Sequence, residues 1–293
     1  MQSVIIKAMA KVNLGLDVLR RRENGYHDVK MVMQTVNLYD TLTLEKREDT
    51  QIVITSNVGE LPLTEDNLIY KAAKLLFDAT GEEKGVQIHL DKQIPIAAGM
   101  AGGSTDAAST LLGLNELFKF GFDKKELAEI GVRIGADVPY CIYGGTYLSE
   151  GIGEMLTKLP DAPECYVVIA KPEIGVSTKY VYENLHIETV TDHPDVDGMV
   201  EAIKAGSLDG VTDKMANVLE RVTIGRYPEI ARMKACLEEN GAKKALMSGS
   251  GPTVFAVFEE EETARKALNK LNETGLVKQG FVTTFAKETG IIE

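Results

Sequence analysis

A run of small residues at positions 95–105 limits what this chain can fold into more than any other feature. It holds three glycines and three alanines and ends in two hydroxyl residues that begin a helical pattern. Glycine permits positive φ angles and close approach of the backbone to another group. At a helix N-terminus several free N–H groups then point at one place, where the helix dipole favours negative charge. The stretch therefore predicts a phosphate-binding loop.

The spacing within this loop excludes two common types of phosphate site. It lacks the Gly-Lys-Ser/Thr ending of a Walker A loop and the G-x-G-x-x-G fingerprint of a dinucleotide site. The alternative is a turn rich in glycine and alanine that serves only the close packing of a strand on a helix. These residues alone leave both interpretations open.

Length and composition are those of a globular protein of two domains. The 293 residues suffice for two domains of about 100–200 residues each. The shares of hydrophobic residues (44%) and charged residues (26%) are ordinary for a soluble protein. No apolar run approaches the ~18 residues of a membrane helix, and the first residues alternate like a strand rather than a signal peptide. We therefore expect a cytoplasmic protein with no membrane partner.

The net charge limits the classes of binding partner, and the cysteines indicate the cellular compartment. The net charge of −12 repels phosphate backbones, so we expect no nucleic acid partner, although local positive charge would still admit a small anionic substrate. The cysteines Cys141, Cys165 and Cys236 lie far apart and form no C-x-x-C pair. With four scattered histidines, this indicates a reducing compartment, no structural zinc, and cysteines that are buried or half-buried.

Apolar periodicity predicts the elements of the first half of the chain. The expected strands are 12–18, 30–38, 41–46, 51–56 and 86–90, with the third and fourth spaced like a hairpin. The expected helices are 68–79, 104–119 and 123–134, and Asp66 is the expected N-cap of the first. Three arginines at 20–22 precede an Asn-Gly turn, and they form either a solvated loop or a group that steers anions.

A change of composition at 158–164 predicts a boundary between a domain at 1–158 and a domain at 159–293. Beyond it, an apolar strand is expected at 166–170, a strand–turn–strand unit at 245–258, and a last strand at 277–286. The expected helices are 176–184, 198–205, 213–222, 227–240 and 260–272. The second half is therefore predicted to be an α+β unit.

Three sequence blocks, in this order, resemble the motifs of the galactokinase, homoserine kinase, mevalonate kinase and phosphomevalonate kinase (GHMP) superfamily. They are Ala-Lys-Val-Asn-Leu at 10–14, the loop at 95–105, and Met-Ser-Gly-Ser-Gly-Pro-Thr-Val-Phe at 247–255. Four more blocks are similar to the branch that phosphorylates 4-diphosphocytidyl-2-C-methyl-D-erythritol. These are Arg-Arg-x-x-Gly-Tyr-His, Asp-Asn-Leu-Ile, Gly-Gly-Ser-Thr-Asp-Ala-Ala and Gly-Ala-Asp-Val-Pro, at 21–27, 66–69, 102–108 and 135–139. The resemblance covers nearly the whole chain.

This resemblance implies a fold and a reaction. The fold is α+β in two domains, the first like ribosomal protein S5 domain 2 and the second ferredoxin-like. The reaction moves the γ-phosphoryl group of ATP, with Mg²⁺, to the 2-hydroxyl of a small substrate that carries a cytidine diphosphate group. One alternative is a homoserine, mevalonate or sugar kinase, although those substrates have no base for the Gly-Tyr-His block to stack on. The other is an idle nucleotide-binding paralogue.

By the same resemblance, Lys11 and Asp137 match the catalytic pair. Asp137 would accept or orient the hydroxyl proton, and Lys11 would keep Asp137 ionised near the transferred group. Without the resemblance, Lys11 is a surface lysine on a strand and Asp137 a turn or cap carboxylate. Retention of both argues against the idle paralogue.

The resemblance also assigns the ATP site. The phosphate loop consists of Pro95, Ile96, Ala97, Ala98, Gly99, Met100, Ala101, Gly102, Gly103, Ser104 and Thr105. A hydroxyl of Ser104 or Thr105 would contact Mg²⁺, and no acidic metal ligand is assigned. Asn67 and Lys92 match positions that line the adenosine end.

For the second substrate, Tyr26 would stack on the cytosine and His27 would recognise its polar edge. Tyr182 matches the aromatic residue on the other face, with core packing as its alternative role. Asn13 would meet the erythritol end. Gly249 and Gly251 would form a turn near the substrate tail.

Three positions depart from the family pattern. Met9 stands in place of a proline, Met100 in place of leucine, and Thr105 in place of serine. Met100 keeps the volume of leucine, and Thr105 keeps the hydroxyl of serine. Met9 is expected to loosen the backbone before Lys11 and to affect activity rather than fold.

Overall fold

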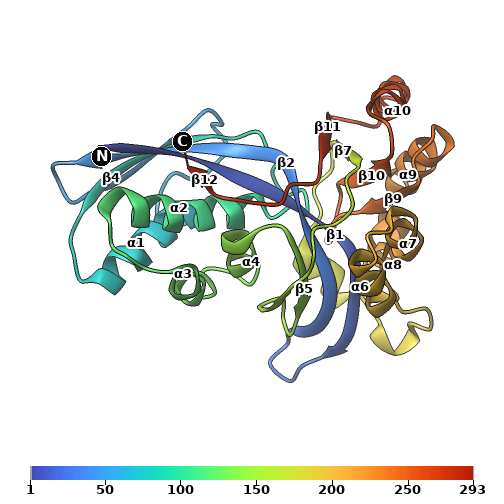
Figure 1. Ribbon diagram of the computed structural model, residues 1–293, viewed down its shortest axis with the longest axis horizontal. Coiled ribbons are helices and arrows are strands. Elements are labelled where there is room, and N and C mark those ends of the chain that lie inside the picture. The colour runs from blue at the N-terminus through green and yellow to red at the C-terminus, as the bar shows by residue number, and fades with distance from the viewer. Residues whose placement is uncertain (1, 293) are drawn as a thin grey trace.

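Two β-sheets carry the structure, a computed structural model that describes residues 2–292 (Figure 1). The first sheet has the order β12-β1-β2-β4-β3, with β5 on β2, β6 on β5 and β8 on β1. Its strands are β1 (Ser3–Arg21), β2 (His27–Arg47), β3 (Ile52–Ser56), β4 (Gly85–Asp91), β5 (Thr146–Glu150), β6 (Met155–Lys158), β8 (Ala216–Asn217) and β12 (Ile291–Ile292). The second sheet has the order β11-β7-β10-β9. Its strands are β7 (Tyr166–Lys171), β9 (Lys244–Met247), β10 (Val254–Phe258) and β11 (Gln279–Thr284).

Helices pack on both sheets. The first sheet carries α1 (Leu68–Thr80), α2 (Gly102–Phe118), α3 (Lys124–Gly131) and α4 (Val138–Tyr143). The second half adds α5 (Thr178–Glu183), a 3-10 turn at Ile187–Thr189, α6 (Val196–Lys204), α7 (Leu208–Lys214), α8 (Glu220–Arg226), α9 (Glu229–Glu239) and α10 (Glu261–Glu273). The predicted α+β class is confirmed. Within residues 2–292, no helix has both the length and the apolar character that a bilayer crossing needs.

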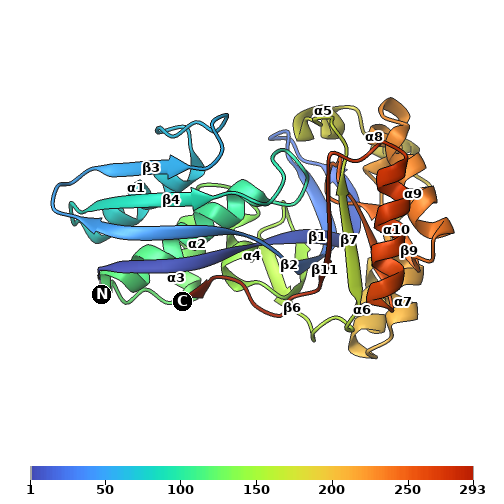
Figure 2. The same cartoon turned by 90° about the horizontal axis from the view of Figure 1, so that it is seen from above.

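One long hairpin, β1–β2, joins the two halves of the molecule. Figure 2 shows these strands of the first sheet running across the molecule to lie beside the second sheet. Their pairing extends from Ser3 opposite Glu45 to Arg21 opposite His27, with irregularities that bend the ribbon, one of them between Met9 and Lys11. The bend lets one face of β1 and β2 pack on the second sheet.

A shared apolar core lies where the hairpin meets the second sheet. Val12 and Leu14 of β1 and Val36 of β2 pack with Val167 of β7 and Phe255 of β10, and all are fully buried. A side chain of this kind stabilises the fold by roughly 1.5–3 kcal/mol when it leaves water. The predicted boundary at residue 158 therefore separates segments that bury one another.

Several predicted elements are confirmed, with small shifts of their ends. The helices expected at 104–119, 198–205, 227–240 and 260–272 correspond to α2, α6, α9 and α10, and the strand expected at 166–170 to β7. The two strands expected at 30–38 and 41–46 are one strand, β2. The sequence analysis missed α4, β5 and β6, because a tyrosine- and glycine-rich segment carries little periodicity.

The pairing expected for strand 51–56 is wrong. It was expected to form a hairpin with 41–46, but β4 lies between them, antiparallel to β2 and parallel to β3. The N-cap of α1 is also different: Asn67, not Asp66, accepts a hydrogen bond from the Ile69 N–H. Asn67 has the extended backbone that an N-cap requires, and its amide also donates to the Pro62 carbonyl at 2.7 Å.

The helix expected at 213–222 is wrong as well. The chain leaves helix α7 at Lys214, forms the two-residue strand β8 beside β1, and begins α8 at Glu220. The break places Asn217 inside the molecule, where its side chain bonds to backbone groups of another segment. Helix α3 also ends earlier than expected, at Gly131, after the Asp123 N-cap and its capping box.

Candidate active site

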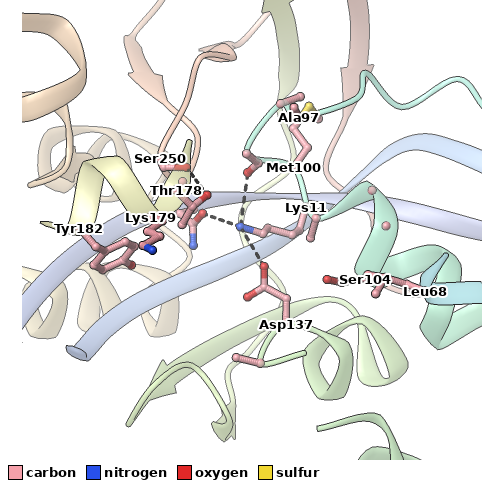
Figure 3. A pocket seen from close by; sticks show the side chains of 18 of the residues that line it. Lys11, Leu68, Ala97, Met100, Ser104, Asp137, Thr178, Lys179, Tyr182 and Ser250 are labelled. Atoms are coloured by element: carbon pink, nitrogen blue, oxygen red, sulfur yellow. Dashed lines mark hydrogen bonds and ion pairs between the residues drawn. The ribbon is translucent and has the colours of Figure 1, made fainter. Parts of the chain in front are cut away.

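A cavity of about 950 Å³ opens between the two halves of the molecule. It is lined by nearly all the residues that sequence analysis assigned to a site, and only Thr105 and Gly251 are not among them. Figure 3 shows Lys11 between Tyr182 on one side and Ser104 and Leu68 on the other. The cavity therefore has two ends with a lysine between them.

The glycine loop forms one wall, and its shape differs from what its glycines suggested. Positive φ angles occur at Gly99 (71°) but also at Ala97 (51°) and Ala101 (56°), which residues with a side chain seldom adopt. Gly102 and Gly103 are helical, and a Cβ there would lie 3.0 Å from the Lys92 Nζ and 3.3 Å from a Leu68 methyl. Strained backbone of this kind persists where the surrounding structure enforces it, as at ligand sites.

Helix α2 starts at the cavity without a side-chain cap. Its N-cap residue, Ala101, has no side chain that accepts a hydrogen bond. The first N–H groups of a helix have no partner within it, and the dipole favours an anion there. The Ser104 side chain lies on the cavity wall, whereas the Thr105 hydroxyl is fully buried and donates to the Met9 carbonyl at 2.8 Å. An anion site with one free hydroxyl results.

Lys11 lies at the middle of the cavity and is only 5% exposed. Its ammonium donates to the Asn13 Oδ1 at 2.8 Å and to the Gly99 carbonyl at 3.4 Å. It lies 3.8 Å from the Asp137 Oδ2 (Figure 3). A cation and a carboxylate, both on the wall of a deep cavity, are thus held close together.

Asp137 faces the cavity because of its place at a helix start. It is the N-cap of α4, yet its side chain makes no capping bond. The carboxylate is one-third exposed and is free to accept a proton from a bound group.

Lys92, which was assigned to the adenosine end, has its ammonium in a buried ion-pair network. The Nζ lies 2.5 Å from an Asp40 oxygen and 2.7 Å from an Asp106 oxygen. Burial disfavours the charged lysine, but Asp106 and Asp40 outweigh it and raise the Lys92 pKa. Burial also raises the pKa of Asp106 well above its usual range, against the opposing effect of Lys92. Because Asp40 also accepts the Gln93 and Ile94 N–H groups, this network fixes the start of the glycine loop.

Aromatic rings form the other end of the cavity. Tyr26, at the tip of the β1–β2 turn, is 59% exposed. The rings of His27 and Tyr182 lie 5.1 Å apart at 39°, so the structure brings these distant residues together. Burial, and to a smaller extent Arg21, lowers the pKa of His27, so this imidazole is neutral at physiological pH. Burial raises the pKa of Tyr182.

The arginine run at 20–22 divides between two roles. Arg20 and Arg22 pair with Asp28, whereas Arg21 lies on the cavity wall. The periodicity of a strand gives this alternation, because neighbouring side chains point to opposite faces.

Sequence analysis missed some residues of the wall. Thr178 and Ser250 line the cavity and their hydroxyl oxygens lie 2.8 Å apart, which links α5 to the turn after β9. Ser250 lies between the two glycines that were assigned, and that position was its only signal. Gly251 lies behind the wall, where a Cβ would be 2.6 Å from the Met247 sulfur.

Outside the cavity, Cys141 and Cys165 are buried and Cys236 is half-buried, as predicted, and all three are free thiols. Burial raises the pKa of Cys165 to about 12, so this thiol is inert. Across residues 2–292, no three His, Cys, Asp or Glu side chains come together as a metal site.

Two families of domains match this chain. Residues 67–145 match the family described as GHMP kinases N terminal domain, and residues 199–276 match GHMP kinases C terminal.

Individual proteins also match along their full length. The chain is 50% identical over 291 residues to 4-diphosphocytidyl-2-C-methyl-D-erythritol kinase of Lachnoclostridium phytofermentans, covering 99% of this chain and 100% of the relative. It is 51% identical over 283 residues to the protein of that name in Lachnospira eligens, covering 97% and 98%. A crystal structure of 4-(cytidine 5'-diphospho)-2C-methyl-D-erythritol kinase superposes with a TM-score of 0.82 at 32% identity, covering 96% of this chain and 99% of that one. Homoserine kinase from Cytophaga hutchinsonii, at 22% identity, has the same TM-score of 0.82, covering 100% and 98%, and shares the fold.

Proposed function

The chain belongs to the GHMP kinase family, and we propose that it phosphorylates the 2-hydroxyl of 4-diphosphocytidyl-2-C-methyl-D-erythritol with ATP. One observation carries this assignment: a single cavity joins an uncapped helix N-terminus to an aromatic pair, with Lys11 and Asp137 between them. These three features, in this order, suit a kinase that acts on a nucleotide-linked alcohol. It is therefore an enzyme of non-mevalonate isoprenoid biosynthesis.

The residues that line the two ends of the cavity indicate where each substrate binds. The phosphates of ATP bind at the start of α2, and its base lies toward Leu68 and the Asn67 turn. The cytosine stacks on Tyr26 and meets the neutral imidazole of His27, with Tyr182 on the far side. Asn13 lies beside Lys11 and meets the erythritol. Asn67 also holds this wall of the cavity, because its amide donates to the Pro62 carbonyl and accepts the Ile69 N–H.

The transfer step uses Asp137 and Lys11. Phosphoryl transfer needs little covalent help, so positioning and stabilisation of charge dominate catalysis. Asp137 accepts the proton of the 2-hydroxyl while the hydroxyl oxygen bonds to the γ-phosphorus. The bond between the γ-phosphorus and the bridging oxygen breaks, and ADP leaves. Lys11, whose Nζ lies 3.8 Å from the Asp137 carboxylate, stabilises the charge on the transferred group.

Mg²⁺ fits the site as a companion of ATP. When bound, it neutralises phosphate charge. The Ser104 hydroxyl, on the cavity wall, would be the protein ligand, whereas the Thr105 hydroxyl is fully buried away from the cavity.

ADP release measured in a coupled assay tests the proposal. We expect turnover with the diphosphocytidyl alcohol and none with mevalonate or homoserine at equal concentration. Turnover with one of the latter alone would identify a different kinase of this family. ATP binding without turnover on any of the three would identify an idle nucleotide-binding protein.

A further inference from the structure

A buried asparagine that belongs to none of the sequence blocks, Asn217, holds the turn after β9. Its side-chain nitrogen donates to the Met247 and Gly249 carbonyls, each at 2.8 Å, and its oxygen accepts the Leu219 N–H at 3.0 Å. The residue is 6% exposed. Since both carbonyls are acceptors, the amide nitrogen must face them. The pairing of β8 with β1 at Leu16 keeps Asn217 in this place.

Between those two carbonyls lies Ser248, which reaches across to the glycine loop. It is fully buried, and its hydroxyl donates to the Gly99 carbonyl at 2.9 Å. The backbones are in direct contact here, because a Cβ on Gly99 would lie 2.2 Å from the Ser248 carbonyl oxygen. The turn that Asn217 holds is therefore packed on the loop of the opposite half.

The Gly99 carbonyl is also a partner of the catalytic lysine. Lys11 donates to it at 3.4 Å and to the Asn13 Oδ1 at 2.8 Å. These two acceptors hold the ammonium on the side where Asp137 lies 3.8 Å away. A shift of the Gly99 carbonyl would move one of the acceptors that place Lys11.

We propose that Asn217 is a positioning residue for phosphoryl transfer, which acts through Ser248 and the Gly99 carbonyl on Lys11. The inference rests on the proposed function, since it concerns the Lys11–Asp137 pair. Asn217 touches neither substrate: it fixes the turn, the turn fixes the carbonyl, and the carbonyl fixes the ammonium. The same turn also contacts α5, which carries Tyr182, through the Ser250–Thr178 pair, so the KM for the cytidyl substrate shows whether a variant disturbs the cytosine end as well.

Three variants test this path. Asn217→Asp keeps the shape but turns two donors into an oxygen that faces two carbonyls. Ser248→Ala removes only the hydroxyl. Ser109→Ala is the matched control, because Ser109 is equally buried and its hydroxyl has no partner. Each is assayed for kcat, for both KM values, and for folding by thermal unfolding.

We expect Ser248→Ala to lower kcat by roughly twofold to tenfold, the effect of one neutral buried hydrogen bond. Asn217→Asp should lower kcat at least as much, Ser248→Ala should leave the KM for the cytidyl substrate unchanged, and Ser109→Ala should behave like the wild type. In the double variant Asn217→Asp/Ser248→Ala, kcat should fall no further than in the more impaired single variant, because both residues act on one path. A purely structural role would lower only the unfolding temperature.

Other results would overturn the inference. These are an unchanged kcat in Ser248→Ala, or single losses that multiply in the double variant. If Asn217→Asp does not fold, Ser248→Ala against Ser109→Ala decides. A wild-type enzyme that phosphorylates a different alcohol contradicts the proposed function alone, and the variants are then compared on that alcohol.

Discussion

At the scale of single residues, the side chain that matters most is an N-cap that does not cap. Helix α4 starts at Asp137, yet the carboxylate faces the cavity and Lys11. An N-cap bond would stabilise the helix by about 1 kcal/mol, so this arrangement gives up local stability. A carboxylate kept free beside a buried lysine is suited to proton transfer.

Replacing Asp137 by Asn keeps the volume but removes the proton acceptor. We expect kcat to fall by ~10²–10⁴, the usual contribution of a positioned acid or base. Both substrates should still bind, since their contacts lie at the two ends of the cavity. Asp123→Asn is the control, because Asp123 also starts a helix but lies outside the cavity. More than a third of wild-type kcat, with chemistry rate-limiting, would contradict a base at Asp137.

Tyr26 is exposed at the mouth of the cavity, so its contact with substrate should be separable from folding. We expect Tyr26→Ala to weaken the cytidyl substrate by about 5–150-fold, which corresponds to the ~1–3 kcal/mol of one base stacked on an aromatic ring. The KM for ATP should stay unchanged in steady-state kinetics. Tyr39→Ala, outside the cavity, is the control. An equal rise in the KM for ATP would mean that Tyr26 contacts ATP rather than the cytidyl substrate.

The lowered pKa of His27 predicts how binding of the cytidyl substrate depends on pH. The imidazole is neutral above a pKa that lies below its usual value near 6.5, and acid adds a proton to it. Protonation changes its hydrogen-bonding pattern, so the KM for the cytidyl substrate should rise once the pH falls below the lowered pKa of His27. His27→Asn should abolish this rise, whereas His186→Asn, on an exposed turn, should retain it. A flat profile in the wild type would exclude His27 from base recognition.

At the scale of elements, the glycine loop and helix α2 act as one unit. The Asp40–Lys92–Asp106 network fixes the start of the loop and the first turns of the helix together. The glycines differ in purpose along it: Gly99 supplies the left-handed turn, and Gly103 keeps the helix start open to a ligand.

Gly103→Val should therefore abolish ATP binding in calorimetry while the protein stays folded. The helical φ of this residue tolerates a side chain, but the valine would lie 3.3 Å from Leu68 and over the helix N-terminus. Gly225→Val is the control, because Gly225 lies in helix α8 with open space around it. Unchanged ATP affinity in Gly103→Val would mean that the loop has only a packing role.

At the scale of the whole molecule, the two halves share a core. A fragment cut at the predicted boundary, residue 158, would lack the side chains of β7 and β10 that pack on Val12 and Val36. We expect a fragment of residues 1–158 to show no cooperative urea unfolding by circular dichroism, whereas the full chain unfolds in one transition. A cooperative transition in the fragment would show that the halves fold independently.

The sequence located the cavity better than it located the sheet. Lys11, Asp137 and the loop belong to short blocks whose residue types carry their chemistry, so each could be recognised locally. The place of β3 depends on the pairing of β4 with the edge of β2, which is a contact between distant segments that no local pattern predicts. Asn217 was hidden for a similar reason: its partners lie about thirty residues away, and only the break between α7 and α8 exposes its role.

The pairing of β12 with β1 has a practical consequence for engineering. Ile292 of β12 lies opposite Ile6 of β1, so segments near the two ends of the chain lie on neighbouring strands at one sheet edge (Figure 1). A short linker could join them, and new ends could be opened in an exposed turn far from the cavity, such as the one between β2 and β3. Because the chain order would change while every strand kept its neighbour, a circularly permuted enzyme should retain its active site.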